Sequence, residues 1–554
     1  MKAKRIFLTI ATFSALVFFA LMIAKAAPSD ELYWENPVPA TDMDSRFPQT
    51  ITDGENMYIF FEEVEKKSKK LWITLISRKE NELKWTAPRR IAGPFDYSGD
   101  EIPDIYSVAK SKDSKKIAMS VQTSKKSIGV YTTSDKCATF EVKEFTEPVK
   151  SLIGPRIFGT STGGFMLFVS LGETADGNDK EAELAASDGQ NQTLLSAASS
   201  IGSFSLLSST SDDGKNWGGL SEFTPAASVK NPFVPYLEEF EADGKIGDIV
   251  FFQGFAETSA VFQLFMTTSF DRQRTWSEAK AMTVHPQYRN QRPYLFTTEE
   301  KDGEESEDEF AVDSSIFDEE ATTFDFEAEE TDADKNGQDA SDAETEEEKK
   351  KPSTRKKTFA AWERTETKSD RSQIMFAEVG MNGSLEDVTE ITTSGSGGSA
   401  HRPTLFSYNG KLSVVWFDDR KGVNGIYMAQ RTGKFWSEKT LVSLKQNSEF
   451  AFPITLGDEL AFAWQQTVDK DGTGRIYALE TDRSVQPPKI AASSFTEGGR
   501  STSEKATAKI MLPKDSSGIA GYTWIWTRNR KDEPPKDLGK LVKPKSTSMT
   551  ANAT

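Results

Sequence analysis

Short apolar segments recur along the chain and alternate with polar turns. They are four to six residues long, rich in β-branched and aromatic side chains, and stand for example at 57–61, 165–169, 249–252, 412–416 and 460–464. A second run follows each after a turn bounded by Gly, Asn, Asp or Ser, a pattern typical of β-strands. No helical period of comparable length appears outside the N-terminal segment, so the sequence predicts an all-β fold.

A proline recurs at the start of each group of strands, about every 50 residues. The positions are Pro48, Pro103, Pro155, Pro235, Pro293, Pro403 and Pro453. Two spacings are longer, and each contains a polar or acidic stretch that accounts for the excess, at 172–199 and 297–357. A fixed period of this length indicates a repeat architecture rather than separate domains.

Four short strands per repeat predict a β-propeller of about seven four-stranded blades over residues 27–494. A single small sheet has two apolar faces, which it buries only by packing against neighbours on both sides. Tyr33 and Trp34 precede the first repeat and are expected to supply an extra outer strand that closes the ring on the last blade.

The net charge of −18 comes almost entirely from one segment. Residues 297–357 contain 24 acidic and 8 basic side chains, so the rest of the chain is nearly neutral. Dense like charge with few aliphatic residues favours disorder, and we expect a disordered insertion within one blade. A solvated spacer is the simpler interpretation, and a cation- or partner-binding segment is the alternative.

The N-terminus has the pattern of an export signal. Lys2, Lys4 and Arg5 precede an apolar run from Ile6 to Ala24, and Ala24-Lys25-Ala26 offers small residues at the two positions that signal peptidase reads. Residues 1–26 are therefore expected to be a signal peptide, with an uncleaved membrane anchor as the alternative. Either case predicts an exported protein that is periplasmic, on the cell surface or secreted.

Residues 495–554 depart from the repeat. Apolar runs at 510–513 and 518–526 resemble the opening strands of an immunoglobulin-like module, although about 100 residues are needed for a complete one. A small or partial module is predicted there.

Composition excludes several kinds of chemistry. Cys137 is the only cysteine, and His285 and His401 are the only histidines, so a cysteine zinc cluster or a histidine metal centre is not expected. The sequence contains no basic stripe with interleaved aromatics of the kind that binds nucleic acid. We expect no metal, no cofactor and no nucleic acid, and membrane contact only through the N-terminal segment.

Three turns share a pattern of Ser/Thr, then Asp two residues on, and an aromatic residue seven positions after the first. The segment 210–217 also has glycine at the fifth position, whereas 269–276 and 133–140 do not. The aspartate is expected to cap its own turn through backbone N–H groups while the aromatic ring packs into the blade. The residues concerned are Thr210, Asp212, Gly214, Trp217, Ser269, Asp271, Trp276, Thr133, Asp135 and Phe140.

These turns resemble the Asp-box, or BNR repeat, of the sialidase-like propeller superfamily, over about residues 33–492. The resemblance implies the propeller fold and marks the turns as structural. Enzymes of that family hold the substrate carboxylate with three arginines, and they use a Tyr–Glu pair and an acidic Asp. Arg46-Phe47-Pro48 resembles the Arg-x-Pro motif of one such arginine, whereas Arg292-Pro293 and Arg402-Pro403 are offset from it by one residue.

The second arginine that the family motif requires is absent, since Glu62 and Glu63 stand in its place, and no Tyr–Glu pair is evident. We therefore predict a non-catalytic propeller that binds protein or glycan ligands, or acts as a scaffold, in the cell envelope. Arg46, Arg292 and Arg402 are its candidate ligand residues, with purely structural roles as the alternative. An exo-sialidase type of glycoside hydrolase is the second hypothesis, and a surface adhesin for glycans is the third.

Overall fold

The computed structural model describes Trp34 and residues 37–481 with gaps, the longest of which are 97–104, 175–200 and 302–353. It also describes the strands at 489–492, 505–511 and 548–552. The expected signal peptide and most of the acidic segment lie outside these residues. Among the described residues no helix has the length and apolar character needed to cross a membrane.

Seven four-stranded antiparallel sheets form a β-propeller, as the repeat predicts. Blade 1 contains β2 (Ser45–Thr52), β3 (Asn56–Glu65), β4 (Lys70–Lys79) and β5 (Arg89–Asp96). Blade 2 contains β6 (Tyr106–Lys110), β7 (Ile117–Ser124), β8 (Ser127–Thr133) and β9 (Glu141–Thr146). Blade 3 contains β10 (Ser151–Gly159), β11 (Phe165–Thr174), β12 (Ile201–Ser211) and β13 (Ser221–Glu222), followed by the 3-10 turn η1 (Thr224–Ala226).

The remaining blades repeat the plan. Blade 4 contains β14 (Lys230–Ala242), β15 (Lys245–Phe255), β16 (Phe262–Ser269) and β17 (Lys280–Ala281). Blade 5 contains β18 (Tyr288–Lys301), β19 (Thr354–Glu366), β20 (Ser372–Val379) and β21 (Leu385–Glu390). Blade 6 contains β22 (Ala400–Tyr408), β23 (Lys411–Asp418), β24 (Gly425–Thr432) and β25 (Phe435–Val442).

Blade 7 is built from both ends of the repeat region. It contains β26 (Ser448–Leu456), β27 (Glu459–Thr467) and β28 (Gly474–Glu480), and β1 (Val38–Pro39) pairs with β28 as its outer strand. Trp34 adds an isolated antiparallel bridge to Thr481. The closing strand that the sequence predicts is therefore present, centred a few residues beyond Tyr33.

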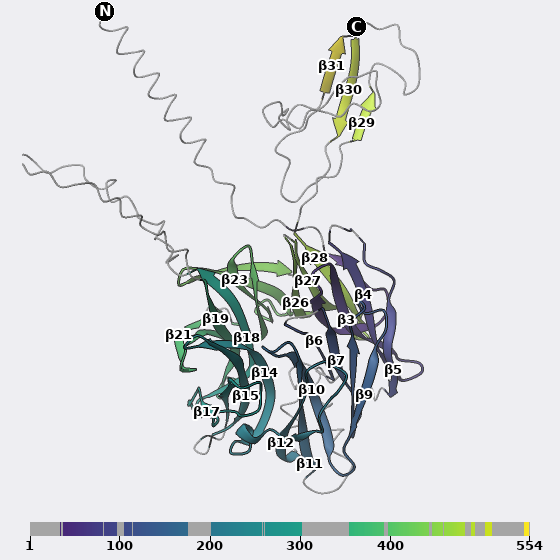
Figure 1. Ribbon diagram of the computed structural model, residues 1–554. Helices are drawn as coiled ribbons and strands as arrows, with labels where there is room; N and C mark the ends of the chain where they lie inside the picture. The colour runs from purple at the N-terminus through teal and green to yellow at the C-terminus, as the bar shows by residue number, and fades with distance from the viewer. Residues whose placement is uncertain are drawn as a thin grey trace, which may run out of the picture. The chain divides into compact units, whose positions relative to one another are not determined.

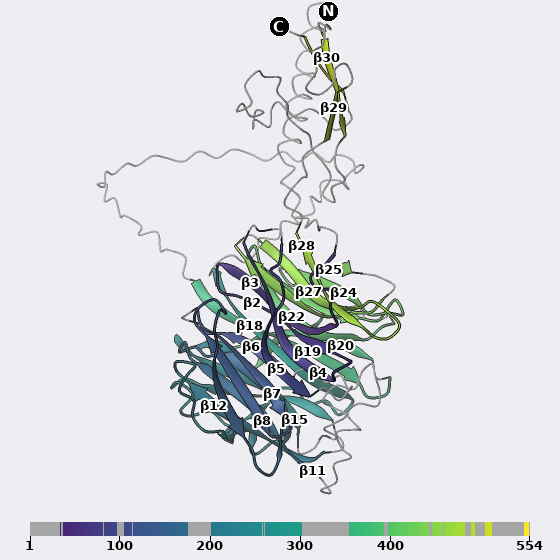
Figure 2. The same cartoon turned by 90° about the vertical axis from the view of Figure 1, so that its right-hand side faces the viewer.

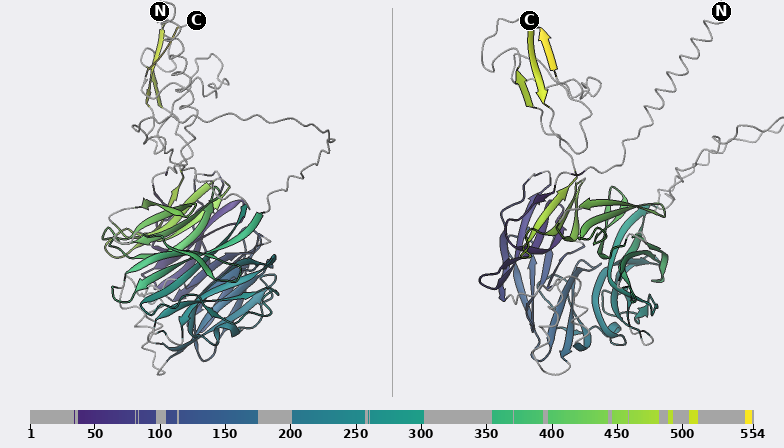
Figure 3. Two further views of the ribbon diagram at one scale, coloured as in Figure 1. Left: turned by 90° about the vertical axis from the view of Figure 1, so that its left-hand side faces the viewer. Right: turned by 180° about the vertical axis from the view of Figure 1, so that it is seen from behind.

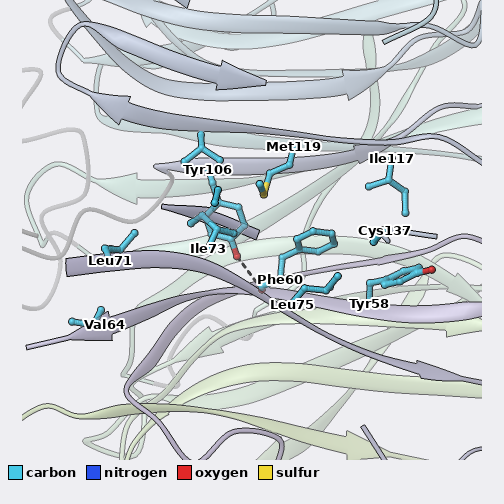
Figure 4. Close-up of a cluster of buried hydrophobic side chains, with 12 residues drawn as sticks. Tyr58, Phe60, Val64, Leu71, Ile73, Leu75, Tyr106, Ile117, Met119 and Cys137 are labelled. Carbon is cyan, nitrogen blue, oxygen red and sulfur yellow. Dashed lines mark hydrogen bonds between the residues drawn. The ribbon is translucent and has the colours of Figure 1, made fainter. Parts of the chain in front are cut away.

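The blades stand around a common axis (Figures 1 and 3). Their apolar faces bury one another. The cluster between blades 1 and 2 shows how: Tyr58, Phe60 and Ile73 of blade 1 pack against Tyr106 and Met119 of blade 2 (Figure 4). The hydroxyl of Tyr106 donates to the carbonyl of Phe60, 3.0 Å away, which satisfies a polar group inside this apolar layer. Seen from the side, successive strands of one blade, such as β7 and β8, lie next to each other (Figure 2).

The recurring proline marks a β-bulge in the innermost strand. In five blades the ladder between the first two strands skips the proline and the residue before it, for example Phe47-Pro48, Arg292-Pro293 and Arg402-Pro403. The residue before the proline has a positive φ of 46–58° in all five, at Phe47, Gly154, Val234, Arg292 and Arg402. In blade 7 the positive φ falls at Phe450, so Ala451 holds the proline position and Pro453 lies two residues beyond it.

A side chain from the preceding blade bonds to this bulge in three places. Gln465 Oε1 accepts from the Phe47 amide at 3.0 Å, Gln253 Oε1 from the Arg292 amide at 3.0 Å, and Glu363 Oε1 from the Arg402 amide at 2.7 Å. Each acceptor lies on the second strand of its blade. We call this contact the blade latch, because it joins neighbouring blades at the axis through a backbone group that the bulge leaves without a ladder partner.

Two boundaries differ from the sequence prediction. The β18–β19 ladder continues to the pair Lys301 and Thr354, so residues 297–301 and 354–357 belong to blade 5 rather than to the acidic insertion. Residues of opposite charge, such as Glu299 and Lys356, are partners in the register there, which favours pairing.

The C-terminal segment forms a second unit with its own antiparallel sheet of β29 (Lys489–Ala492), β30 (Lys505–Met511) and β31 (Ser548–Asn552). Residues 489–492 thus pair with this unit and not with the propeller. The immunoglobulin-like character of the segment stays a prediction.

Candidate functional site

A cavity of about 280 Å³ lies at the propeller axis. The first strands of all seven blades contribute to its wall, through Gln49, Val108, Arg156, Tyr236, Tyr294, Thr404 and Phe452 among others. A concave site with a few charged side chains at the meeting point of several elements is the usual setting for ligand binding. We take this central cavity as the candidate site.

Two of the three candidate arginines border the central cavity. Arg292 and Arg402 belong to its lining, and Arg156 joins them, whereas Arg46 does not. Arg46 is 2% exposed and its Nε lies 3.2 Å from Asp44 Oδ1. The offset from the proline explains the difference. Arg46 stands two residues before Pro48 and pairs with Glu62 in the ladder, while Arg292 and Arg402 occupy the left-handed bulge position itself.

A buried carboxylate joins blades 5 and 6 beside the cavity. The side chain of Glu363 is fully buried, and Arg292 Nη1 donates to its Oε1 and Oε2 at 2.9 and 3.0 Å. Gln291 Nε2 donates to Oε2 at 3.2 Å, and His401 Nδ1 lies 3.5 Å from the same oxygen. Burial alone would raise the pKa of Glu363, but the charge of Arg292, the contact with His401 and the Arg402 amide together lower it below its usual value.

The bulge residues of blades 6, 7 and 1 contact one another in turn. The guanidinium of Arg402 lies over the ring of Phe450, 4.8 Å from its centroid. The rings of Phe450 and Phe47 meet edge to face with centroids 4.8 Å apart. The cation is therefore held against an aromatic surface, an arrangement that stabilises a partly buried arginine.

Three aromatic rings from consecutive blades form one side of the cavity. Phe158 lies 5.0 Å from Tyr236 between ring centroids, and Tyr236 lies 4.5 Å from Tyr294. Burial raises the pKa of Tyr294 to about 12 and that of Tyr236 well above its ordinary value. Both hydroxyls are therefore protonated at neutral pH and can donate hydrogen bonds.

A charged pair lies at the same cavity. Lys112 and Glu238 both belong to its lining and form an ion pair. Burial alone would lower the pKa of Lys112, but the nearby carboxylates of Glu238, Glu239 and Asp248 raise it. Arg156, the two tyrosines, Lys112 and Glu238 were not predicted as site residues from the sequence. Arg156, Tyr236 and Tyr294 each directly follow a repeated proline, and that position was their only signal in the sequence.

Two of the three aspartate turns are built alike. Asp135 accepts from the amide of Thr139 at 3.0 Å and from the hydroxyl of Thr133 at 2.7 Å. Asp271 makes the equivalent bonds to Thr275 and Ser269, at 2.9 and 3.0 Å. These turns place two successive non-glycine residues at positive φ, Lys136 and Cys137 in one, Arg272 and Gln273 in the other.

The turn at 210–217 uses a different pair of residues from the one that the sequence pattern indicates. Asp213, not Asp212, accepts from the amides of Lys215 and Asn216 at 2.8 and 2.7 Å, and Ser211 rather than Thr210 supplies the hydroxyl. Only Gly214 has a positive φ here, so the turn is one residue tighter than the other two. Trp217 packs with the apolar cluster between blades 2 and 3, as Trp276 does between blades 3 and 4.

Substitutions at these adjacent aspartates test that assignment. We expect Asp213→Ala to lower the free energy of unfolding by about 1 kcal/mol, the net value of a typical hydrogen bond. Asp212→Ala is the matched control and should leave it within about 0.5 kcal/mol. Urea unfolding followed by fluorescence measures both, and an equal or larger loss for Asp212→Ala would show that the turn uses the other frame.

Metal binding has no candidate among the residues that the structure describes, since no three His, Cys, Asp or Glu side chains there form a group that could hold an ion. His285 lies in the connection between β17 of blade 4 and β18 of blade 5, and His401 lies on β22 of blade 6. Cys137 is buried, and burial raises the pKa of its thiol to about 12.

No family model matches the sequence, and no curated protein matches it. Solved structures with a similar fold include the polysaccharide lyase Uly1, with 10% identity and a TM-score of 0.42 over 82% of this chain and 93% of that one. An α-L-arabinanase of Penicillium chrysogenum complexed with arabinobiose has 9% identity and a TM-score of 0.35, over 81% of this chain and 98% of that one. The Trypanosoma rangeli sialidase has 9% identity and a TM-score of 0.34, over 71% of this chain and 56% of that one. At these values the similarities carry no conclusion about activity or ligand.

Proposed function

We propose that this chain is an exported, non-catalytic propeller that binds a small polar ligand, a saccharide, in the central cavity. The observation that supports this most directly is the composition of the cavity wall, where three contacting aromatic rings stand beside arginines and a Lys–Glu pair. Aromatic faces pack against the apolar faces of a small ligand, while the charged groups and hydroxyls bond its polar atoms. Export is supported by the sequence of residues 1–26.

Binding is favoured over sialidase-type catalysis by the state of the side chains. A tyrosine nucleophile requires activation, yet burial raises the pKa of both cavity tyrosines. Arg46, the residue that resembles the family arginine, is buried against Asp44 and does not border the cavity. A protein ligand remains the alternative occupant for the outer faces, but a cavity of this volume is suited to a small molecule.

Titration of the full chain with glucose, glucuronate and N-acetylneuraminate, followed by calorimetry, tests the proposal. We expect binding to at least one of them, and Tyr294→Ala should weaken it by about tenfold or more because the cavity wall loses a stacking surface. Phe435→Ala is the control, since Phe435 is 81% exposed on an outer strand.

Failure of all three saccharides to bind, or equal binding by Tyr294→Ala, would contradict the proposal. Turnover of a fluorogenic sialoside that disappears in Arg292→Ala would instead support the hydrolase hypothesis.

A further inference from the structure

The blade latch needs an acceptor oxygen and not a charge. In blades 4 and 7 the latch residue is a neutral glutamine, Gln253 or Gln465, and each bonds its bulge amide at 3.0 Å. Among the three latches described above, the one from blade 5 uses a glutamate, Glu363, for the same bond. A glutamine at 363 would therefore suffice to join blade 5 to blade 6.

The charge of Glu363 is nevertheless buried completely. Burial of an ionised carboxylate is unfavourable unless opposite charge and hydrogen bonds compensate for it. The compensation comes from Arg292, whose Nη1 contacts both carboxylate oxygens, together with Gln291 and the nearby imidazole of His401. Since the latch does not need this charge, its contacts identify what it does: it holds the guanidinium of Arg292.

We infer that Glu363 is a positioning residue of the central cavity, which fixes the Arg292 guanidinium through its charge and the Arg402 backbone through the latch. One buried carboxylate thereby sets both bulge arginines that border the cavity. Both stand at a positive φ, a conformation that non-glycine residues keep only when their surroundings hold them in it. The inference rests on the proposed function, in which these side chains face a bound ligand.

The variant Glu363→Gln separates the two roles, because the blades with Gln253 and Gln465 show that glutamine supports the latch. The first measurement needs no ligand. Phenylglyoxal modifies accessible guanidinium groups, and peptide mass spectrometry gives the rate at Arg292. We expect that rate to rise about threefold or more in Glu363→Gln while the rate at Arg402 is unchanged, because Glu363 bonds the guanidinium of Arg292 but the backbone amide of Arg402.

The matched control is Glu390→Gln, which neutralises another glutamate of blade 5 that pairs with Arg364 at 3.0 Å. It should leave the Arg292 rate unaltered. If Glu363→Gln fails to fold, Glu363→Asp retains the charge on a shorter side chain and should give an Arg292 rate above that of the wild-type protein. If the folded variant gives the same modification rate at Arg292 as the wild-type protein, the inference is overturned.

The second measurement is binding of glucuronate, whose carboxylate an arginine fork accepts, with glucose as the neutral comparison. We expect Glu363→Gln to weaken glucuronate binding by about tenfold and glucose binding by less. Equal weakening of both would show that Glu363 acts on the fold of the cavity and not on Arg292, which also overturns the inference. If the unmodified protein binds neither sugar, the proposed function fails, and the modification rates alone decide the role of Glu363.

Discussion

Replacement of Trp416 by alanine is expected to destabilise the propeller by about 3–5 kcal/mol, the usual cost of emptying a large aromatic site in a core. Trp416 lies on β23, is fully buried, and stacks on Tyr427 with ring centroids 6.1 Å apart. It belongs to the apolar cluster between blades 5 and 6, so the substitution would leave a void in the contact between these two blades.

Urea unfolding of Trp416→Ala beside Phe435→Ala measures this effect. Phe435 is also on blade 6 but is 81% exposed, so its loss should change the free energy of unfolding by less than about 0.5 kcal/mol. Trp416→Phe should fall between them, because a ring remains and the indole N–H, which has no hydrogen-bond partner among the described residues, is removed. Similar losses for Trp416→Ala and Phe435→Ala would contradict the assigned packing.

Acid is expected to remove the stability that Glu363 contributes. The folded-state pKa of Glu363 is lowered from 4.5, although burial opposes this, because Arg292 and His401 favour the ionised form. A group with a lowered folded pKa stabilises the protein fully above its unfolded pKa, and this stabilisation is lost as the pH falls through the folded value. Glu363→Gln should therefore cost about 2–4 kcal/mol near neutral pH, because the charge that Arg292 Nη1 contacts is removed.

The difference in free energy of unfolding between the two proteins should shrink as the pH falls below 4.5. Guanidinium unfolding at a series of pH values from about 6 to about 3 gives that difference directly. The aspartate turns also lose hydrogen bonds in acid, but they are common to both proteins and cancel. A difference that stays constant over this range would show that the Glu363 charge does not stabilise the folded state.

The fold was predictable because its repeat has a strong local cause. In five blades the repeated proline lies in a bulge of the innermost strand, where its missing N–H does not interrupt the ladder, so these five prolines share one structural position. Pro453 follows the 50-residue spacing but does not lie at the bulge position, because in blade 7 Ala451 is the residue that follows the left-handed Phe450. A spacing pattern tolerates such a shift of two residues, and the number of blades was unaffected.

The candidate site was only partly predictable, because side-chain direction changes with a single residue of offset. Arg46, Arg292 and Arg402 all stand at blade entrances, yet only the two that immediately precede proline border the cavity. Glu363 gave no signal as a functional residue, since it follows Trp362 at the end of an apolar strand and its partners are distant in sequence. The tyrosines were hidden in the same way, because their role depends on contact between blades.

The composition of blade 7 has a consequence for how the protein is made. Its outer strand β1 comes from the beginning of the chain and its other three strands from residues 448–480, so neither part is a complete sheet without the other. During synthesis blade 1 is complete long before blade 7, and β1 has no strand to pair with until β28 is made. Ring closure is therefore a late event, because β1 has its partner strand β28 only once residues 448–480 have been synthesised.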